Sequence, residues 1–538
     1  MAPEAETLRP VGATEWLARV SWPRWSVATW IATGLGALFV ASTCWWLSVD
    51  RSVPIDDAAV HLGASFNTYE ALTAGHLLRA LTGSAPYPPL TFLVGALGVS
   101  IGGIGVAPPI IAQNLIFVPL LGLGCYKAAQ LAFGRFAGVL AVVFALGMPM
   151  IIEEFHEFML DAPEAAMVAV AVWAILASER FSRPGVSALA GVAVGLGMLS
   201  KETFVFFVAG VALAAAVRGG RRAWRGAATF AAVVLVIALP WYLYELSTIH
   251  ALGGEALGSS STTSVQIPGI APPRLSSANL EWYLWTFLNW ELYLPLFAFA
   301  AVGLAWTLVG FARRRPVSRF AVELTSGAFV SWAALTGTYV HDPRYAIPMA
   351  VYFAVFGAGW IARLPRLAGV VASAALVLVA LANSLGVGFG VGSRMTTGAQ
   401  NLTYIQQPET LTISENYGFW IGPPSRNGDT LALLQVLRKD GVREVKWTSE
   451  PEGDLEFSPP GVAVLVRIAG LAQASDPIVP ARAARSYAFL MHRPLELNLP
   501  TPCIKLRDGT GVWVRLGGSP SAGAGAWSYC PLRQAGAS

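Results

Sequence analysis

Two adjacent carboxylates, Asp56 and Asp57, follow directly after a long apolar stretch at residues 26–47. A carboxylate within hydrogen-bond reach of a hydroxyl group can remove its proton, and a second carboxylate beside it can orient the first. Ionisable groups near the membrane are costly to place there and usually serve a function. The pair is therefore the first candidate for catalytic chemistry in this chain.

Further acids and bases stand at the ends of later apolar stretches. Asp161 opens one stretch, Lys201 follows another, and Arg344-Tyr345 come after His341-Asp342 at the start of a third. Cations of this kind stabilise charge that develops on a phosphate, and the forked guanidinium suits phosphate oxygens.

Each of these residues also has a purely structural interpretation. Asp56, Asp57 and Asp161 can cap the helices that follow them. Lys201 can extend its chain to the membrane surface, and Arg344 can pair with its neighbour Asp342. These alternatives stay open from the residues alone.

A small cluster at residues 153–157 holds Glu153, Glu154, His156 and Glu157. Its spacing follows no rule for a metal site, so we predict no metal and no cofactor. We expect Glu154 and His156, together with His341, to line a pocket beside the charged residues above.

The composition places most of the chain in a membrane. Of its 538 residues 55% are hydrophobic and only 13% are charged, whereas soluble domains carry about 25% charged residues. The net charge of +4 is too small and dispersed to suggest nucleic acid. Residues 26–47 are long enough to cross a bilayer, which predicts a retained first span after a cytoplasmic segment at residues 1–25.

Basic residues recur in every second loop between the apolar stretches, and such loops stay in the cytoplasm. This alternation predicts about eleven spans, provided that the short apolar piece at residues 89–103 dips into the membrane or lies flat. The candidate site then faces outward from the plasma membrane.

The organisation follows from this pattern. Residues 26–394 form the transmembrane domain, with a first outer loop at 49–108 whose residues 58–81 predict interfacial helices. A second outer loop at 249–280 could act as a lid. Residues 395–538 predict a small extracytoplasmic α/β domain, with helices at 430–439 and 479–491, strands at 444–448 and 461–468, and a hairpin of 504–506 with 512–516. Its two cysteines, Cys503 and Cys530, could form a disulfide there.

The chain resembles the polytopic glycosyltransferases of the protein O-mannosyltransferase and aminoarabinose transferase type, which share the GT-C fold and use polyprenyl-phosphate sugars. Five short elements carry the resemblance in the order of that family: Asp56-Asp57, Tyr87-Pro88-Pro89-Leu90, Asp161-Ala162-Pro163, Leu199-Ser200-Lys201 and Asp342-Pro343-Arg344-Tyr345. The His or Lys of that family is missing before Pro88, where this chain has Tyr87.

The resemblance implies a role for each residue. Asp56 would be the general base, Asp57 would orient it, and Asp161 would bind the acceptor or the sugar. Lys201, Arg344 and Tyr345 would hold the donor phosphate, and displacement would invert the anomeric carbon. The partners would be a polyprenyl-phosphate sugar, a protein, lipid or glycan acceptor, and membrane lipids.

Two other functions compete with this interpretation. A transporter or lipid flippase would place essential charges at mid-bilayer in broken helices. A non-catalytic assembly or sensor subunit would act through its C-terminal domain.

Overall fold

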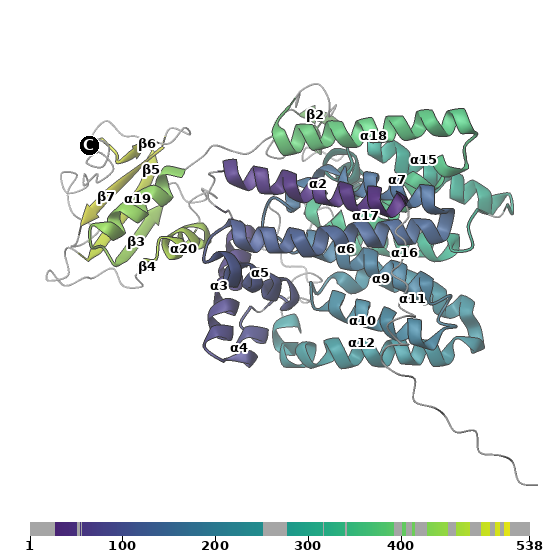
Figure 1. The fold of residues 1–538 in the computed structure, drawn as a ribbon, viewed down its shortest axis with the longest axis horizontal. Helices are drawn as coiled ribbons and strands as arrows, with labels where there is room; N and C mark the ends of the chain where they lie inside the picture. Colours follow the sequence, from purple (N-terminus) through teal and green to yellow (C-terminus); the bar gives the residue numbers. More distant parts are fainter. Residues whose placement is uncertain are drawn as a thin grey trace, which may run out of the picture.

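The computed structural model shows a helical bundle with a smaller domain beside it (Figure 1). The N-terminal segment and the greater part of the predicted lid lie outside the described residues. So do His341, Cys530 and the side chain of Asp56. The described ranges are 27–50, 54, 56–84, 86–250, 277–315, 317–338, 342–391, 401–404, 411–414, 428–449, 459–473, 486–494, 501–505 and 510–516.

Seven helical segments among the described residues are long and apolar enough to cross a membrane, so the chain is a multi-pass membrane protein. They are α2 (Val27–Val49), α6 (Ala107–Phe133), α11 with η1 (Phe204–Arg222), α12 (Trp224–Tyr244), α15 (Tyr293–Ala312), η3 with α17 and η4 (Pro343–Arg363), and α18 (Arg366–Phe389).

Four shorter helices lie among these segments in the bundle: α7 (Arg135–Leu146), α9 (Asp161–Ala177), α10 (Pro184–Met198) and α16 (Ala321–Thr336). Helix α9 is almost wholly buried and packs against α6, α10 and α11. Eleven spans would require all four shorter helices to cross as well, so that number stays a prediction.

The expected dip at residues 89–103 is the helix α5 (Leu90–Gly102). Its 13 residues are too few for a crossing, which takes about 20. It packs against α6 and α3 (Asp56–Thr73), and α3 continues into the short α4 (Leu77–Thr82). Figure 1 shows these helices at the end of the bundle that faces the smaller domain.

The C-terminal domain holds a five-stranded mixed sheet in the order β4-β3-β5-β7-β6. Helix α19 (Gly428–Lys439) and helix α20 (Pro459–Ile468) accompany it, and β1 (Asn401–Tyr404) pairs with β2 (Leu411–Ser414) in a separate hairpin. The strands are β3 (Glu444–Ser449), β4 (Ala472–Gln473), β5 (Tyr487–Pro494), β6 (Ile504–Lys505) and β7 (Thr510–Leu516).

Two expectations for this domain are wrong. Residues 461–468 form helix α20 rather than a strand, because Val462, Leu465, Val466 and Ala469 bury one side at helical spacing. The predicted helix at 479–491 is strand β5 over its described part. This strand lies between β3 and β7, and its consecutive residues Ala488, Phe489 and Leu490 are all buried, so both of its faces are covered and its apolar residues do not alternate.

Other expectations are confirmed. The hairpin of β6 and β7 is antiparallel, and α19 and β3 lie where the pattern predicts them. Cys503 is disulfide-bonded, whereas Cys44 and Cys125 are free.

A buried ion triad joins three helices at the end of the bundle opposite this domain. Glu323 near the start of α16 is fully buried. It accepts from Arg180 Nε at 2.7 Å and from Arg218 Nη1 at 2.6 Å. Arg180 lies in the turn after α9, where three successive residues, Glu179 to Phe181, hold positive φ angles. Such angles are costly for residues other than glycine, so the triad holds a strained turn.

We expect Glu323→Ala to lower the free energy of unfolding by about 3–5 kcal/mol, because two cations lose their common partner. Thermal unfolding of the detergent-solubilised chain would measure the loss. The matched control is Glu179→Ala, whose side chain is 37% exposed and pairs with Arg183 and Arg319 at the surface. Equal shifts in the two variants would contradict a structural role for the triad.

Candidate active site at the end of the helix bundle

The first part of the site is a buried pair between Lys201 and Asp161. The Lys201 ammonium donates to Asp161 Oδ1 at 2.6 Å, and both side chains are less than a tenth exposed. Asp161 opens helix α9, and Lys201 follows the end of α10, so the packing of these two helices sets the pair. The Tyr345 ring lies against the same ammonium, 4.7 Å from ring centre to Nζ.

The second part is centred on Arg344. Its Nη2 donates to Asp57 Oδ2 and to Asp342 Oδ2, each at 2.8 Å. Asp342 also accepts from the Arg344 backbone N–H at 3.0 Å and thereby caps η3. Arg344 Nε donates to Asp342 Oδ2 at 3.0 Å, and among the described residues Nη1 has only the sulfur of Met159 within reach, at 3.9 Å. Arg344 is therefore fixed on one side and has donor capacity left on the other.

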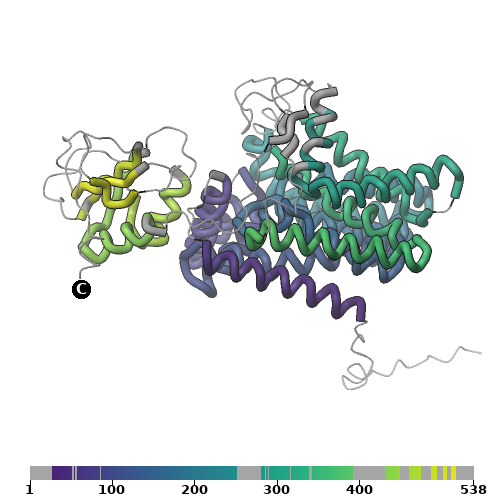
Figure 2. Tube along the Cα trace, turned by 90° about the horizontal axis from the view of Figure 1, so that it is seen from above, coloured from purple at the N-terminus to yellow at the C-terminus, as the bar shows by residue number. Residues whose placement is uncertain are grey.

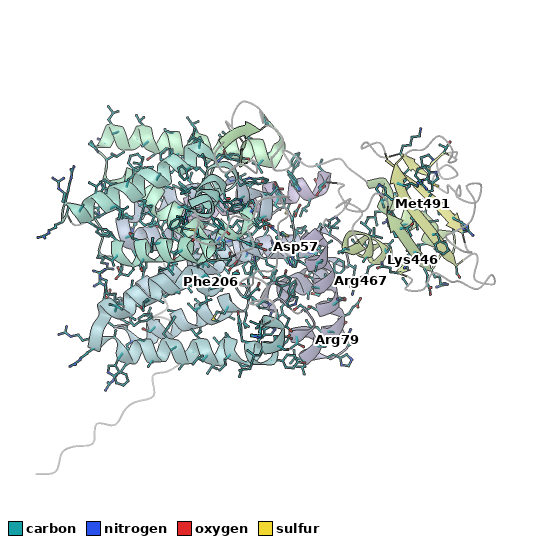
Figure 3. The ribbon with its side chains drawn as sticks, turned by 180° about the vertical axis from the view of Figure 1, so that it is seen from behind. Asp57, Arg79, Phe206, Lys446, Arg467 and Met491 are labelled. Carbon is teal, nitrogen blue, oxygen red and sulfur yellow. The ribbon has the colours of Figure 1, made fainter. Side chains whose placement is uncertain are left out.

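The two parts belong to one cluster. Burial by itself would raise the pKa of Asp57, but the charge and hydrogen bond of Arg344, with a smaller contribution from the charge of Lys201, hold that pKa below its usual range. Burial likewise would lower the pKa of Lys201, but the charges of Asp161, Glu164 and their acidic neighbours together outweigh burial and keep that pKa well above the usual value. Both cations thus act on the same end of α3, and Figure 3 shows Asp57 at the end of the bundle nearest the smaller domain.

The structure therefore brings together five of the residues singled out from the sequence: Asp57, Asp161, Lys201, Arg344 and Tyr345. Asp56 is the first residue of α3, directly before Asp57, but its side chain lies outside the described residues, as does His341. Among the described residues, no group of three or more His, Cys, Asp or Glu side chains could hold a metal ion.

Glu154 and His156, expected in one pocket, have different surroundings. Glu154 ends helix α8 (Pro149–Glu154), and its charge interacts with Asp161 and Arg344. The ring of His156 instead stacks on Trp46 of α2 at 3.9 Å between centroids, and burial lowers its pKa to about 3. Only Glu154 is placed beside the two ion pairs.

One residue of the cluster was missed. Glu291 ends the π-helical turn η2 (Phe287–Glu291) and is fully buried, and neither of its carboxyl oxygens has a hydrogen-bond partner among the described residues. Burial raises its pKa well above the usual value, and the charges that act on it are those of Glu154, Asp161 and Asp342. The sequence could have pointed to Glu291, because a glutamate inside the aromatic and apolar stretch 282–297 is unusual.

The carboxyl groups of Glu291 and Glu154 lie near each other. The elements that carry them, η2 and α8, contact each other and η3, and Oε2 of Glu154 also lacks a partner. A buried carboxyl group without a donor costs about 1–3 kcal/mol. These carboxyl oxygens beside the ion pairs can take part in hydrogen bonds, which suits hydroxyl groups of a bound molecule.

Comparison with known proteins supports the resemblance drawn from the sequence. The family model for dolichyl-phosphate-mannose-protein mannosyltransferase matches residues 86–244. That segment contains Tyr87, Asp161 and Lys201, whereas Asp57 and Arg344 lie outside it. No curated protein matches the chain in sequence.

Solved structures extend the likeness to most of the chain. The crystal structures of ArnT from Cupriavidus metallidurans, one bound to undecaprenyl phosphate and one in the apo state, each have a TM-score of 0.51 and 16% sequence identity. Each match covers 86% of this chain and 93% of that chain. An oligosaccharyltransferase from Archaeoglobus fulgidus matches with a TM-score of 0.46 at 13% identity, over 85% of this chain and 65% of that one. The fold is thus of the GT-C type.

The pairing of Lys201 with Asp161 can be tested by its energetics. We expect Lys201→Met to destabilise the chain by about 3–5 kcal/mol, because Asp161 is left as an uncompensated buried charge. The double variant Lys201→Met with Asp161→Leu should recover most of this loss. Thermal unfolding measures both, and Lys439→Met, at the exposed end of α19, is the control. If the two substitutions lower the free energy of unfolding additively, the ion pair makes no net contribution to stability.

Proposed function

We propose that this chain is a membrane glycosyltransferase that moves a sugar from a polyprenyl-phosphate donor to an acceptor hydroxyl group on the outer side of the plasma membrane. The observation that carries the proposal is the convergence of Lys201, Arg344, Asp57 and Asp161 at one end of the bundle. The match to a mannosyltransferase family model and the fold of ArnT, one of whose structures holds undecaprenyl phosphate, support it.

The two cations suit a lipid phosphate. Lys201 has three N–H donors and Arg344 has five, and the described contacts use only some of them. Phosphate oxygens could take the remaining donors while Asp161 and Asp342 keep both side chains in place. As the bond from the sugar to the phosphate breaks, negative charge grows on that phosphate, and fixed cations in a buried site stabilise it at little cost in reorganisation.

The acidic pair provides the base. In the proposed reaction the acceptor oxygen attacks the anomeric carbon, its proton passes to Asp56, and the lipid phosphate leaves from the opposite face of the sugar. The configuration at the anomeric carbon is thereby inverted. Asp57 is bound to Arg344, which suits it to orient Asp56 rather than to accept the proton itself.

The positions of the charged residues at helix ends disfavour a transporter. Asp161 opens α9, Lys201 follows α10, and Arg344 stands in the first turn of η3. Transporters instead hold substrate near the bilayer midplane in discontinuous helices. A site at helix ends can meet a lipid headgroup and a water-borne acceptor at once.

We expect Asp56→Asn to lower the rate of sugar transfer by about 10²–10⁴, the usual contribution of a general base. Asp57→Asn should cost less in kcat, because it removes an orienting contact and one partner of Arg344. Transfer from a panel of undecaprenyl-phosphate monosaccharides by the purified chain would measure both, with Asp440→Asn in the C-terminal domain as the control. Unchanged transfer in Asp56→Asn would refute the assigned base.

We expect Arg344→Lys to weaken the binding of undecaprenyl phosphate by about tenfold or more, since an ammonium cannot contact Asp57, Asp342 and a phosphate in one plane. Native mass spectrometry of the chain with that lipid would show the change. Arg467→Lys, at the contact between the two domains, is the matched control. Equal binding in wild type and Arg344→Lys would remove Arg344 from the donor site.

A further inference from the structure

A cavity of about 540 Å³ lies between helix α3 of the first outer loop and helix α20 of the C-terminal domain. This volume is within the range of about 300–1,000 Å³ that is usual for small-molecule sites. Figure 3 shows Arg467 of α20 reaching toward the helices near Asp57, and Figure 2 shows the domain beyond that end of the bundle.

Specific contacts hold α20 against α3. The Arg467 guanidinium pairs with Glu70 at 2.5 Å, donates to Asn67 Oδ1 at 2.8 Å, and lies 5.3 Å from the centre of the Phe66 ring. Val464 of α20 is buried in a cluster with Phe66 and other residues of α3 and α5. The C-terminal domain is thus docked by a cation and an apolar side chain, and it forms one wall of the cavity.

The opposite wall is shared with the candidate active site. His61 and Tyr87 line the cavity, and their rings meet edge-on at 5.1 Å between centroids. His61 lies one helical turn after Asp57 on α3, on the same side of the helix. Burial, together with the charges of Asp57 and Glu202, raises the pKa of Tyr87 to about 12. A molecule in the cavity would therefore stand beside the acidic pair.

The charges in the lining narrow down what this cavity could hold. Arg467 is the only charged side chain among the described lining residues, and Glu70 already neutralises it. His61 is uncharged near neutral pH, because burial lowers its pKa to about 3. The other polar groups are neutral, and aromatic rings lie between them; the lining includes Asn67, Ser84, Tyr87, Gln473, Phe66 and Phe92.

Such a lining offers no free cation for a phosphate or carboxylate and no carboxylate for an amine. It offers hydrogen bonds and apolar ring faces together, which matches the hydroxyl groups and C–H faces of an uncharged sugar. We propose that this cavity is the acceptor subsite and that it takes the end of a neutral carbohydrate chain, with the C-terminal domain as its outer wall. The inference rests on the proposed function, whose donor site is the ion-pair cluster.

The test uses the full-length chain and fills the cavity from the side of the domain. Ala463 lines the cavity on α20 and is far in sequence from every residue assigned to the cluster. Ala463→Leu and Ala463→Trp fill the space in two steps. Gln435→Trp adds the same ring to the exposed side of α19 as the matched control. Saturation-transfer NMR with mannotriose and maltotriose measures acceptor binding, and native mass spectrometry with undecaprenyl phosphate measures donor binding.

We expect wild type and Gln435→Trp to bind at least one neutral trisaccharide, Ala463→Leu to bind it more weakly, and Ala463→Trp to lose at least tenfold. Undecaprenyl phosphate should bind all four chains equally, which also shows that each is folded. The inference is overturned if neither trisaccharide binds wild type, if Ala463→Trp binds like the control, or if glucose 6-phosphate or glucosamine binds more tightly than both. Failure of undecaprenyl phosphate to bind wild type would instead count against the proposed donor.

Discussion

The site depends on two cations held by carboxylates in a place that little water reaches. Lys201 and Arg344 could not remain charged there alone, because a buried charge without a partner costs several kcal/mol. Asp161 neutralises the first, and Asp57 with Asp342 neutralises the second. The partners come from α9, α3 and the turn before η3, so the pairs also fix how these elements meet. The charges of the candidate site and the packing of the helix ends therefore depend on the same ion pairs.

The same pairs set the chemistry that each acid can perform. Arg344 keeps the pKa of Asp57 low, so this carboxylate is ionised but a weak base. The shared guanidinium would lose part of its hold on Asp57 when a phosphate takes some of its donors. Asp57 would then be freer to orient Asp56, the proposed base. Sharing of one arginine between Asp57 and the phosphate would thus couple the orientation of the proposed base to the presence of the lipid.

The sequence predicted the polar residues of the site better than the shape around them. Asp161, Lys201 and Arg344 were identifiable because they fall in short elements that match a known family in order, although each charge alone also has a structural interpretation. Glu291 was passed over because it lies within an aromatic stretch rather than at its end. The secondary structure of the C-terminal domain was harder to predict. Residues 461–468 are rich in β-branched side chains, which favour a strand. They nevertheless form helix α20, because tertiary packing buries their apolar residues on one side at helical spacing. Strand β5 is buried on both faces, so neither periodicity marks it.

The conformation around Glu291 carries two free-energy costs. The π-helical turn η2 widens the helix just before this residue, and Tyr293 just after it has a φ of 53°, an angle that is unfavourable for an aromatic residue. Burial without hydrogen bonds adds a further penalty to the carboxyl group. Neither cost is offset by a contact of the Glu291 carboxyl group with the described chain. In the proposed reaction, a sugar whose hydroxyl groups reach Glu291 and Glu154 would give these oxygens hydrogen-bond partners and so remove the second of the two costs.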